Sequence, residues 1–151
     1  MNEVELTTLA NSLIQQHLWG EIYEWRFAID RAKRRFWCCH YQSHTISISW
    51  PLALLNSEEQ IRDTILHEIA HAMTPRAWHG WRWKQACIQI WAKPQRCYGE
   101  EVTKVEKKFK GVCPTCHREI LRHRKKQISC GKCSLRYSPE HAFIWSINNN
   151  K

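Results

Sequence analysis

The sequence lacks several features that would assign it to a class at once. No run of apolar residues reaches the 18 or so that a membrane-spanning helix needs, so we expect no transmembrane segment. The first 16 residues contain no basic side chain and their apolar residues are interrupted by polar ones, unlike a secretory signal. No internal repeat is present. These absences predict a cytoplasmic (nucleoid-associated) protein, or a nuclear one in a eukaryote.

The length and the charge distribution indicate two parts. A chain of 151 residues can form a core of about 100 residues together with a small module. Residues 104–136 carry 11 Lys and Arg against two Glu, whereas the rest of the chain has 12 basic and 12 acidic residues. The whole net charge of +9 therefore lies in one segment, which favours a polyanionic partner such as nucleic acid. We predict a core over residues 1–103 and a basic module over residues 104–151.

The hydrophobic pattern of the core indicates an α+β fold. A period of about 3.6 residues predicts helices, and alternation predicts strands that form a three-stranded antiparallel meander. Ser57 and Gln60 form a capping-box pattern before the second helix, and Pro75 ends that helix. The expected elements are a helix over 4–18, strands over 23–29, 36–41 and 45–50, a helix from 57 to 75 and a helix over 80–93.

The second helix carries His67-Glu68-x-x-His71, the pattern of a zinc peptidase. Two histidines four residues apart lie on one helix face and can bind one Zn²⁺, while Glu68 can take a proton from a water at the metal. Two alternatives are a helix with merely exposed histidines and a structural zinc site without chemistry. A structural site would close with a fourth protein ligand, and no cysteine lies close by in the sequence.

His79 is the expected third ligand, because a chain that turns back after Pro75 can bring it to the metal. The metzincin pattern fails, since it needs glycine where Thr74 stands. A glutamate ligand on the next helix also fails, because residues 80–93 contain no glutamate. Two further histidines, His40 and His44, are expected in the core or on the surface. Tyr98 and Arg76 are weak candidates for stabilising an oxyanion.

Two Cys-x-x-Cys pairs, 13 residues apart, predict a four-cysteine structural zinc site. The alternative is two redox pairs or disulfides. The ligands would be Cys113, Cys116, Cys130 and Cys133. The interval between the pairs is long enough for a hairpin. Its basic residues are candidates for phosphate contacts, or else form a solvated surface: Arg118, Arg122, Arg124, Lys125 and Lys126. Three aromatic residues either stack on bases or form the module's small core: Tyr137, Phe143 and Trp145.

The combination of motifs resembles the SprT-like metallopeptidases, a family that includes the Spartan-type DNA-dependent proteases. The resemblance rests on the HExxH motif, on His79-Gly80-x-x-Trp83, on the preceding strand 46–51 and on the two cysteine pairs. It covers roughly residues 5–140. It implies a compact zincin-type core followed by a zinc ribbon, and proteolysis of proteins attached to DNA. By position, the family's zinc ligands fall on His67, His71 and His79, and its general base falls on Glu68.

The sequence therefore predicts a zinc-dependent endopeptidase with one catalytic and one structural Zn²⁺. Its expected substrates are DNA-associated or DNA-crosslinked proteins, and its expected partner is DNA, single-stranded or damaged, bound by the basic ribbon. One alternative is a non-enzymatic nucleic-acid-binding accessory factor that uses the zinc core as a scaffold. Another is a housekeeping or toxin-type protease whose ribbon binds protein or RNA.

Overall fold

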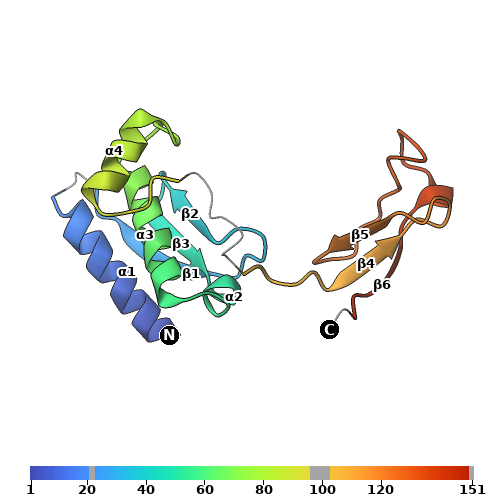
Figure 1. Cartoon of the computed structure of the whole chain (residues 1–151), viewed down its shortest axis with the longest axis horizontal. Helices are drawn as coiled ribbons and strands as arrows, with labels where there is room; N and C mark the ends of the chain where they lie inside the picture. Colours follow the sequence, from blue (N-terminus) through green and yellow to red (C-terminus); the bar gives the residue numbers. More distant parts are fainter. Residues whose placement is uncertain (21–22, 96–102, 150–151) are drawn as a thin grey trace. The chain divides into compact units, whose positions relative to one another are not determined.

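The computed structural model describes residues 1–20, 23–95 and 103–149. The chain forms two compact units, Met1–Val105 and Glu106–Lys151. The first unit contains α1 (Glu3–Leu18), β1 (Arg26–Asp30), β2 (Trp37–His40), β3 (Thr45–Ser49), α2 (Trp50–Ala53), α3 (Glu58–Met73) and α4 (Trp81–Gln89) (Figure 1). The second contains β4 (Phe109–Val112), β5 (Glu119–Arg122), a 3₁₀ turn (Pro139–His141) and β6 (Ile144–Ile147). The predicted mixture of helices and small sheets is confirmed.

The helices of the first unit follow their sequence patterns. α1 begins at a capping box between Asn2 and Glu5, and α3 begins at the predicted box between Ser57 and Gln60. The two helices lie side by side; α1 packs on β1, and α3 packs on β2 and β3 (Figure 1). The apolar residues of α3 lie in the core, so its histidines lie on another face of the helix. α4 packs against α3.

The three-stranded sheet differs from the predicted antiparallel meander. Its order is β1-β3-β2, with β3 in the centre, parallel to β1 and antiparallel to β2. Residues 31–36 do not form a hairpin turn, because Ser49 at the end of β3 binds them twice. The Ser49 hydroxyl donates to the Ala32 carbonyl, and the Ser49 backbone N–H donates to the Phe36 carbonyl at 2.8 Å. The linker therefore crosses the end of β3 and places β2 on its other side.

α4 is shorter than predicted. The helical spacing within residues 80–93 predicts a core face formed by Trp83, Cys87, Ile90 and Trp91. The helix ends at Gln89, and its C-cap residue is Ile90. Trp83, Cys87 and Ile90 are buried as their spacing predicted, but Trp91 is 89% exposed. Trp91 has a positive φ of 62°, so the chain has left the helix there and the side chain no longer follows the helical period.

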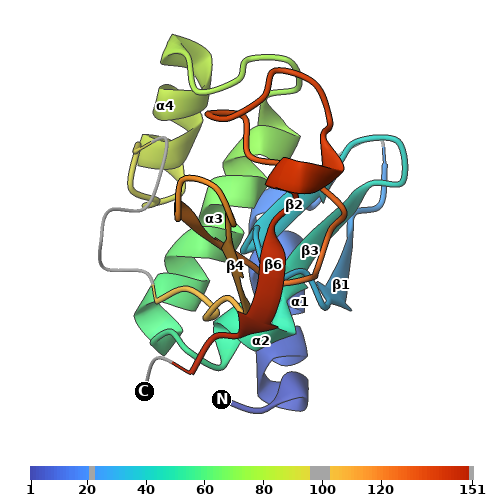
Figure 2. The same cartoon turned by 90° about the vertical axis from the view of Figure 1, so that its right-hand side faces the viewer.

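The second unit is built around the cysteine pairs. Its sheet has the order β5-β4-β6, and both outer strands run antiparallel to β4. β4 and β6 lie side by side in Figure 2. β4 and β5 form a hairpin that encloses the first cysteine pair. The prediction of a hairpin within the interval between the two pairs is therefore wrong, because β5 pairs with β4, which precedes the first cysteine. Within the described residues, no helix has the length and apolar character needed to cross a membrane.

Candidate metal centres

The structure brings His67, His71 and His79 together at one point. Nε2 of His79 lies 3.2 Å from Nε2 of His71 and 3.3 Å from Nε2 of His67. The potential ligand atoms of all three lie within 4.8 Å of one another. A tetrahedral zinc with bonds of 2.0–2.1 Å would separate two nitrogen ligands by about 3.3 Å. The spacing of the imidazoles therefore fits a zinc ion, although other divalent ions accept the same ligands.

The turn after α3 places the third histidine. α3 ends at Met73, and three successive backbone bonds then fold the chain back: Thr74 to His71, Ala77 to Thr74 and Gly80 to Ala77, at 3.0–3.2 Å. The Thr74 hydroxyl adds a bond to the Ala70 carbonyl at 2.7 Å. This tight turn reverses the chain within a few residues and returns His79 to the face that carries the other two histidines.

The indole ring of Trp83 packs against all three imidazoles. Its ring centroid lies 4.7 Å from that of His67, 5.3 Å from that of His71 and 4.6 Å from that of His79. The ring of Trp37 also lies near His67, with 5.5 Å between the two ring centroids. Burial is the largest cause that lowers the pKa of His67 to about 3 and that of His71 to about 4. Both imidazoles are therefore neutral near pH 7, which is the form that binds a metal.

Glu68 is buried beside this cluster, with 2% of its surface exposed. Burial raises the pKa of Glu68 to about 8, and hydrogen bonds from the Trp37 side chain and the Cys39 backbone N–H oppose that rise. Its Oε1 has no hydrogen-bond partner among the described residues and lies 3.8 Å from Nε2 of His67. A buried carboxylate oxygen without a donor is unfavourable. A water held at the metal would supply that donor, so the glutamate also fits a metal centre.

The structure places His40 and His44 in contacts with other residues than the three histidines. Nε2 of His40 lies 3.4 Å from the Ser47 hydroxyl, and the ring of His44 stacks on Tyr23 at 4.2 Å. Arg76 is exposed on the turn after α3. Tyr98 falls outside the residues that the structure describes.

Sequence reasoning missed four contributors to this centre. Trp37 and the Cys39 N–H bind Glu68, Tyr41 donates to the His71 carbonyl at 3.2 Å, and Trp83 packs on all three histidines. Trp83 was expected in the core from its helical spacing, which gives no sign of what its ring faces. The others belong to β2 and its turn, and nothing local in the sequence connects that strand with Glu68.

The four cysteines of the second unit form another cluster. Their sulfur atoms lie within 4.8 Å of one another, with 3.9 Å between Cys113 and Cys133 and 3.6 Å between Cys116 and Cys130. A tetrahedral zinc with Zn–S bonds of 2.3 Å separates its sulfurs by about 3.8 Å. All four are free thiols, not disulfides. The Cys116 backbone N–H is the largest cause that lowers the pKa of Cys113 to about 6, which favours the thiolate that binds metal.

The basic residues predicted to contact phosphate are all exposed, and none forms an ion pair with another described residue. Arg118 lies in the turn after the first cysteine pair, where its carbonyl accepts from Cys113. Arg122 ends β5, and Arg124, Lys125 and Lys126 follow it. Among the aromatic candidates, Phe143 and Trp145 pack in the small core, as one of the two interpretations expected, whereas Tyr137 is 51% exposed.

The fold and the two clusters define an α+β protein with two centres that can hold metal ions. The chain belongs to the SprT-like family, whose model matches residues 5–108. The four-cysteine cluster lies beyond that match and is an independent observation. The chain is also 28% identical over 118 residues to the Germ cell nuclear acidic-1 protein of Caenorhabditis elegans, covering 66% of this chain and 22% of that protein. It thus spans about a fifth of that relative's length.

Proposed function

We propose that this protein is a zinc-dependent endopeptidase that cleaves proteins associated with DNA or crosslinked to it. The observation that carries the proposal is the arrangement of three histidines at zinc spacing beside a buried carboxylate oxygen that has no donor among the described residues. His67, His71 and His79 would hold a catalytic Zn²⁺. When bound, the metal would polarise the peptide carbonyl and acidify a water.

The chain's own residues supply the proton transfer and the surroundings. Glu68 would take the proton of the attacking water at Oε1, to which no described residue donates, and return it to the leaving amine. The Trp37 side chain and the Cys39 N–H would hold the carboxylate in position. Trp83 would exclude water from behind the histidines. A pKa of Glu68 raised by burial suits a group that both accepts and donates a proton near neutral pH.

The second unit would bring the peptidase to DNA. Its cysteines would hold a structural Zn²⁺, and its basic residues would contact phosphates. The absence of ion pairs at these five side chains within the described residues supports this role, because their charges are not compensated by the protein. A nuclear or nucleoid-associated location would follow from DNA binding, and the name of the relative describes a nuclear protein.

The test is cleavage of a DNA-binding protein by wild type and Glu68→Gln, each with and without single-stranded DNA. Zinc content is measured first, since Glu68 is not a ligand and both proteins should hold the same amount. We expect cleavage that requires DNA and that falls at least about 100-fold in the variant, the order of magnitude of general acid–base catalysis.

Two outcomes would replace the proposal. Equal behaviour of wild type and Glu68→Gln at equal zinc content would indicate a nucleic-acid-binding accessory factor with the zinc core as a scaffold. Cleavage that depends on Glu68 but not on DNA would indicate a protease whose ribbon binds protein or RNA.

A further inference from the structure

Two exposed tryptophans flank the candidate metal ligand His79. Trp78 directly precedes it and is 79% exposed, and Trp81 follows two residues later and is 73% exposed. Consecutive Cα atoms are about 3.8 Å apart, so both tryptophans leave the backbone within about 8 Å of His79. An indole is among the largest apolar groups that a protein can bury, and two of them in solvent at a candidate catalytic centre indicate a binding surface.

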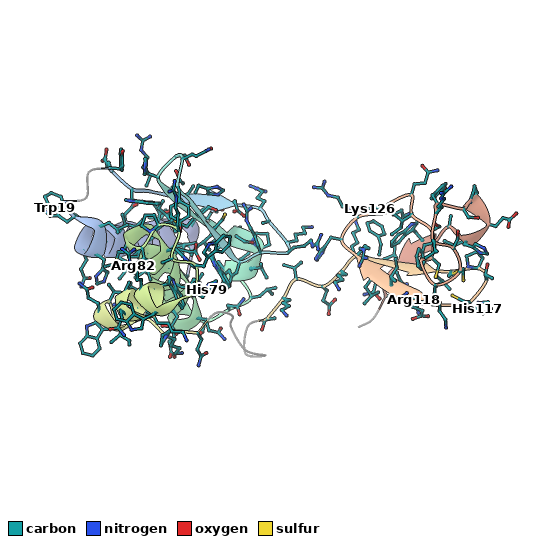
Figure 3. All side chains as sticks on the ribbon, turned by 90° about the horizontal axis from the view of Figure 1, so that it is seen from above. Trp19, His79, Arg82, His117, Arg118 and Lys126 are labelled. Atoms are coloured by element: carbon teal, nitrogen blue, oxygen red, sulfur yellow. The ribbon has the colours of Figure 1, made fainter. Side chains whose placement is uncertain are left out.

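The charged residues next to these tryptophans in the sequence are all basic. Arg76, Arg82 and Lys84 are exposed, and none of them is ion-paired within the described part of the chain. Residues 69–99 contain five Lys and Arg and not one Asp or Glu, although the chain outside residues 104–136 carries no net charge. One of the five, Lys93, pairs with Glu59 and Asp63 of α3. Positive charge is thus concentrated on the segment that enters and forms α4. Figure 3 shows His79 and Arg82 on this segment.

The backbone of the turn is strained where the first tryptophan stands. Arg76 and Trp78 have φ values of 65° and 50°, in the left-handed region that a bulky side chain rarely adopts. Such outliers persist only where the surrounding structure fixes them, and they gather at functional sites. Here the backbone bonds around Thr74 and Ala77 fix the turn that returns His79 to the metal centre. The same turn leaves Trp78 exposed.

We propose that Arg76, Trp78, Trp81, Arg82 and Lys84, the aromatic–basic surface, bind single-stranded nucleic acid beside the catalytic centre. Unpaired bases stack on exposed indoles, and the neighbouring basic side chains bind the phosphates. A duplex does not fit this chemistry, because its bases are already stacked on each other. The inference rests on the proposed action near DNA and adds a contact on the first unit that is separate from the ribbon. A protein attached to the bound strand would then be held close to Glu68 and the three histidines.

Photocrosslinking locates the contact directly. The zinc-loaded full chain is irradiated together with a single-stranded oligonucleotide that contains 5-bromodeoxyuridine. The oligonucleotide has about 15 nucleotides, within the range of known site sizes. The crosslinked protein is then digested with trypsin. Cleavage after Arg76 and Arg82 leaves residues 77–82, which carry both tryptophans. Residues 1–26 form the matched control peptide, since it contains Trp19, which is 80% exposed at the end of α1 (Figure 3). We expect adducts on residues 77–82 and none on 1–26. Adducts confined to residues after 103 would overturn the proposal.

Affinity measurements separate stacking from charge. We expect the double variant Trp78→Ala/Trp81→Ala to bind a fluorescent oligothymidine about tenfold more weakly than the wild type. The double variant Trp78→Phe/Trp81→Phe should retain most of the affinity, and Trp19→Ala should leave the affinity unchanged. Arg76→Ala/Arg82→Ala should make the negative slope of log K against log salt concentration shallower by about 0.7 for each lost phosphate contact. Unchanged binding by the double tryptophan-to-alanine variant would overturn the proposal.

A loss of peptide cleavage by Trp78→Ala/Trp81→Ala with unchanged oligonucleotide binding would assign the surface to a polypeptide instead. The test is independent of proteolysis, because Glu68→Gln should bind and crosslink the oligonucleotide as the wild type does. A protein without peptidase activity would therefore still show whether the surface binds nucleic acid.

Discussion

The side chain of Trp37 reaches from the edge strand β2 to the carboxylate of Glu68. We predict that Trp37→Phe, which keeps an aromatic ring but removes the indole donor, lowers kcat for protein cleavage by about 10- to 100-fold. The reason is that a catalytic group misplaced by a fraction of an ångström loses most of its advantage. Zinc content and KM should change little, because the smaller aromatic ring still packs on His67 and no ligand is altered.

Trp25→Phe is the matched control for this prediction. Trp25 is also partly buried against the core of the first unit, and its ring contacts are with Tyr41 and His44 rather than with Glu68. A general loss of packing would affect both variants. If Trp37→Phe and Trp25→Phe have the same kcat at equal zinc content, Trp37 does not position the base.

At the level of single residues, the sequence predicts what one helix carries and little of what surrounds it. His67, Glu68 and His71 share α3, so a spacing of four residues is enough to place them together. The contacts of Trp37 and Cys39 with Glu68 join residues far apart in the chain and depend on which strand lies at the sheet edge next to α3. No periodicity in the sequence contains that information, because strand order follows from tertiary contacts.

Strand β4 contains a glycine over which an aromatic ring lies. A Cβ on Gly111 would lie 2.9 Å from Cζ3 and 3.0 Å from Cε3 of Trp145, and 3.2 Å from Cβ of Phe143. We predict that Gly111→Ala destabilises the second unit by roughly 1–3 kcal/mol, the usual cost of overpacking a core. The measurement is the rate at which a chelator removes zinc from the four cysteines, which should rise. Gly131→Ala is the control, since nothing lies within 4 Å of its added Cβ. Equal rates in both variants would contradict the prediction.

Asp30 fastens the linker that sets the strand order. It accepts hydrogen bonds from the Ala32 backbone N–H at 2.8 Å, the Ser47 hydroxyl at 3.0 Å and Arg35 at 3.1 Å. Partial burial acts to raise the pKa of Asp30, but these bonds outweigh it and hold the pKa below its ordinary value. A carboxyl with a lowered folded pKa stabilises the fold above its unfolded pKa and loses that effect as the pH falls through the folded value.

We therefore predict that Asp30→Asn destabilises the protein by roughly 1–2 kcal/mol at pH 7, and that the difference shrinks below about pH 4. Urea unfolding of both proteins at several pH values between about 7 and about 3 measures it. A difference that is constant over this range would mean that the charge of Asp30 is not involved. The same linker shows why the meander prediction failed: short distance in the sequence favoured a β1–β2 hairpin, but Ser49 and Asp30 bind the linker to the end of β3.

The two units differ in how much apolar core each has without metal. The core of the first unit is formed by side chains from α1, the sheet, α3 and α4. In the second unit, the buried residues of the core cluster within the described part are Cys113, Cys130 and Phe143, and two of these are candidate ligands. A module of this size generally needs a metal or disulfides to fold. Metal removal should therefore affect the two units differently.

We predict two zinc ions per chain and independent consequences of losing each. Cys130→Ser should remove one equivalent and abolish hydrogen-exchange protection in β4, because the second unit has little core without its metal. His79→Ala should remove the other equivalent and abolish cleavage, while α3 stays protected by its packing against α1 and the sheet. Zinc analysis and exchange mass spectrometry of the full chain measure both effects. Loss of protection in both units after either substitution would show that the metals support one cooperative structure, and the assignment of chemistry to one unit and stability to the other would then fail.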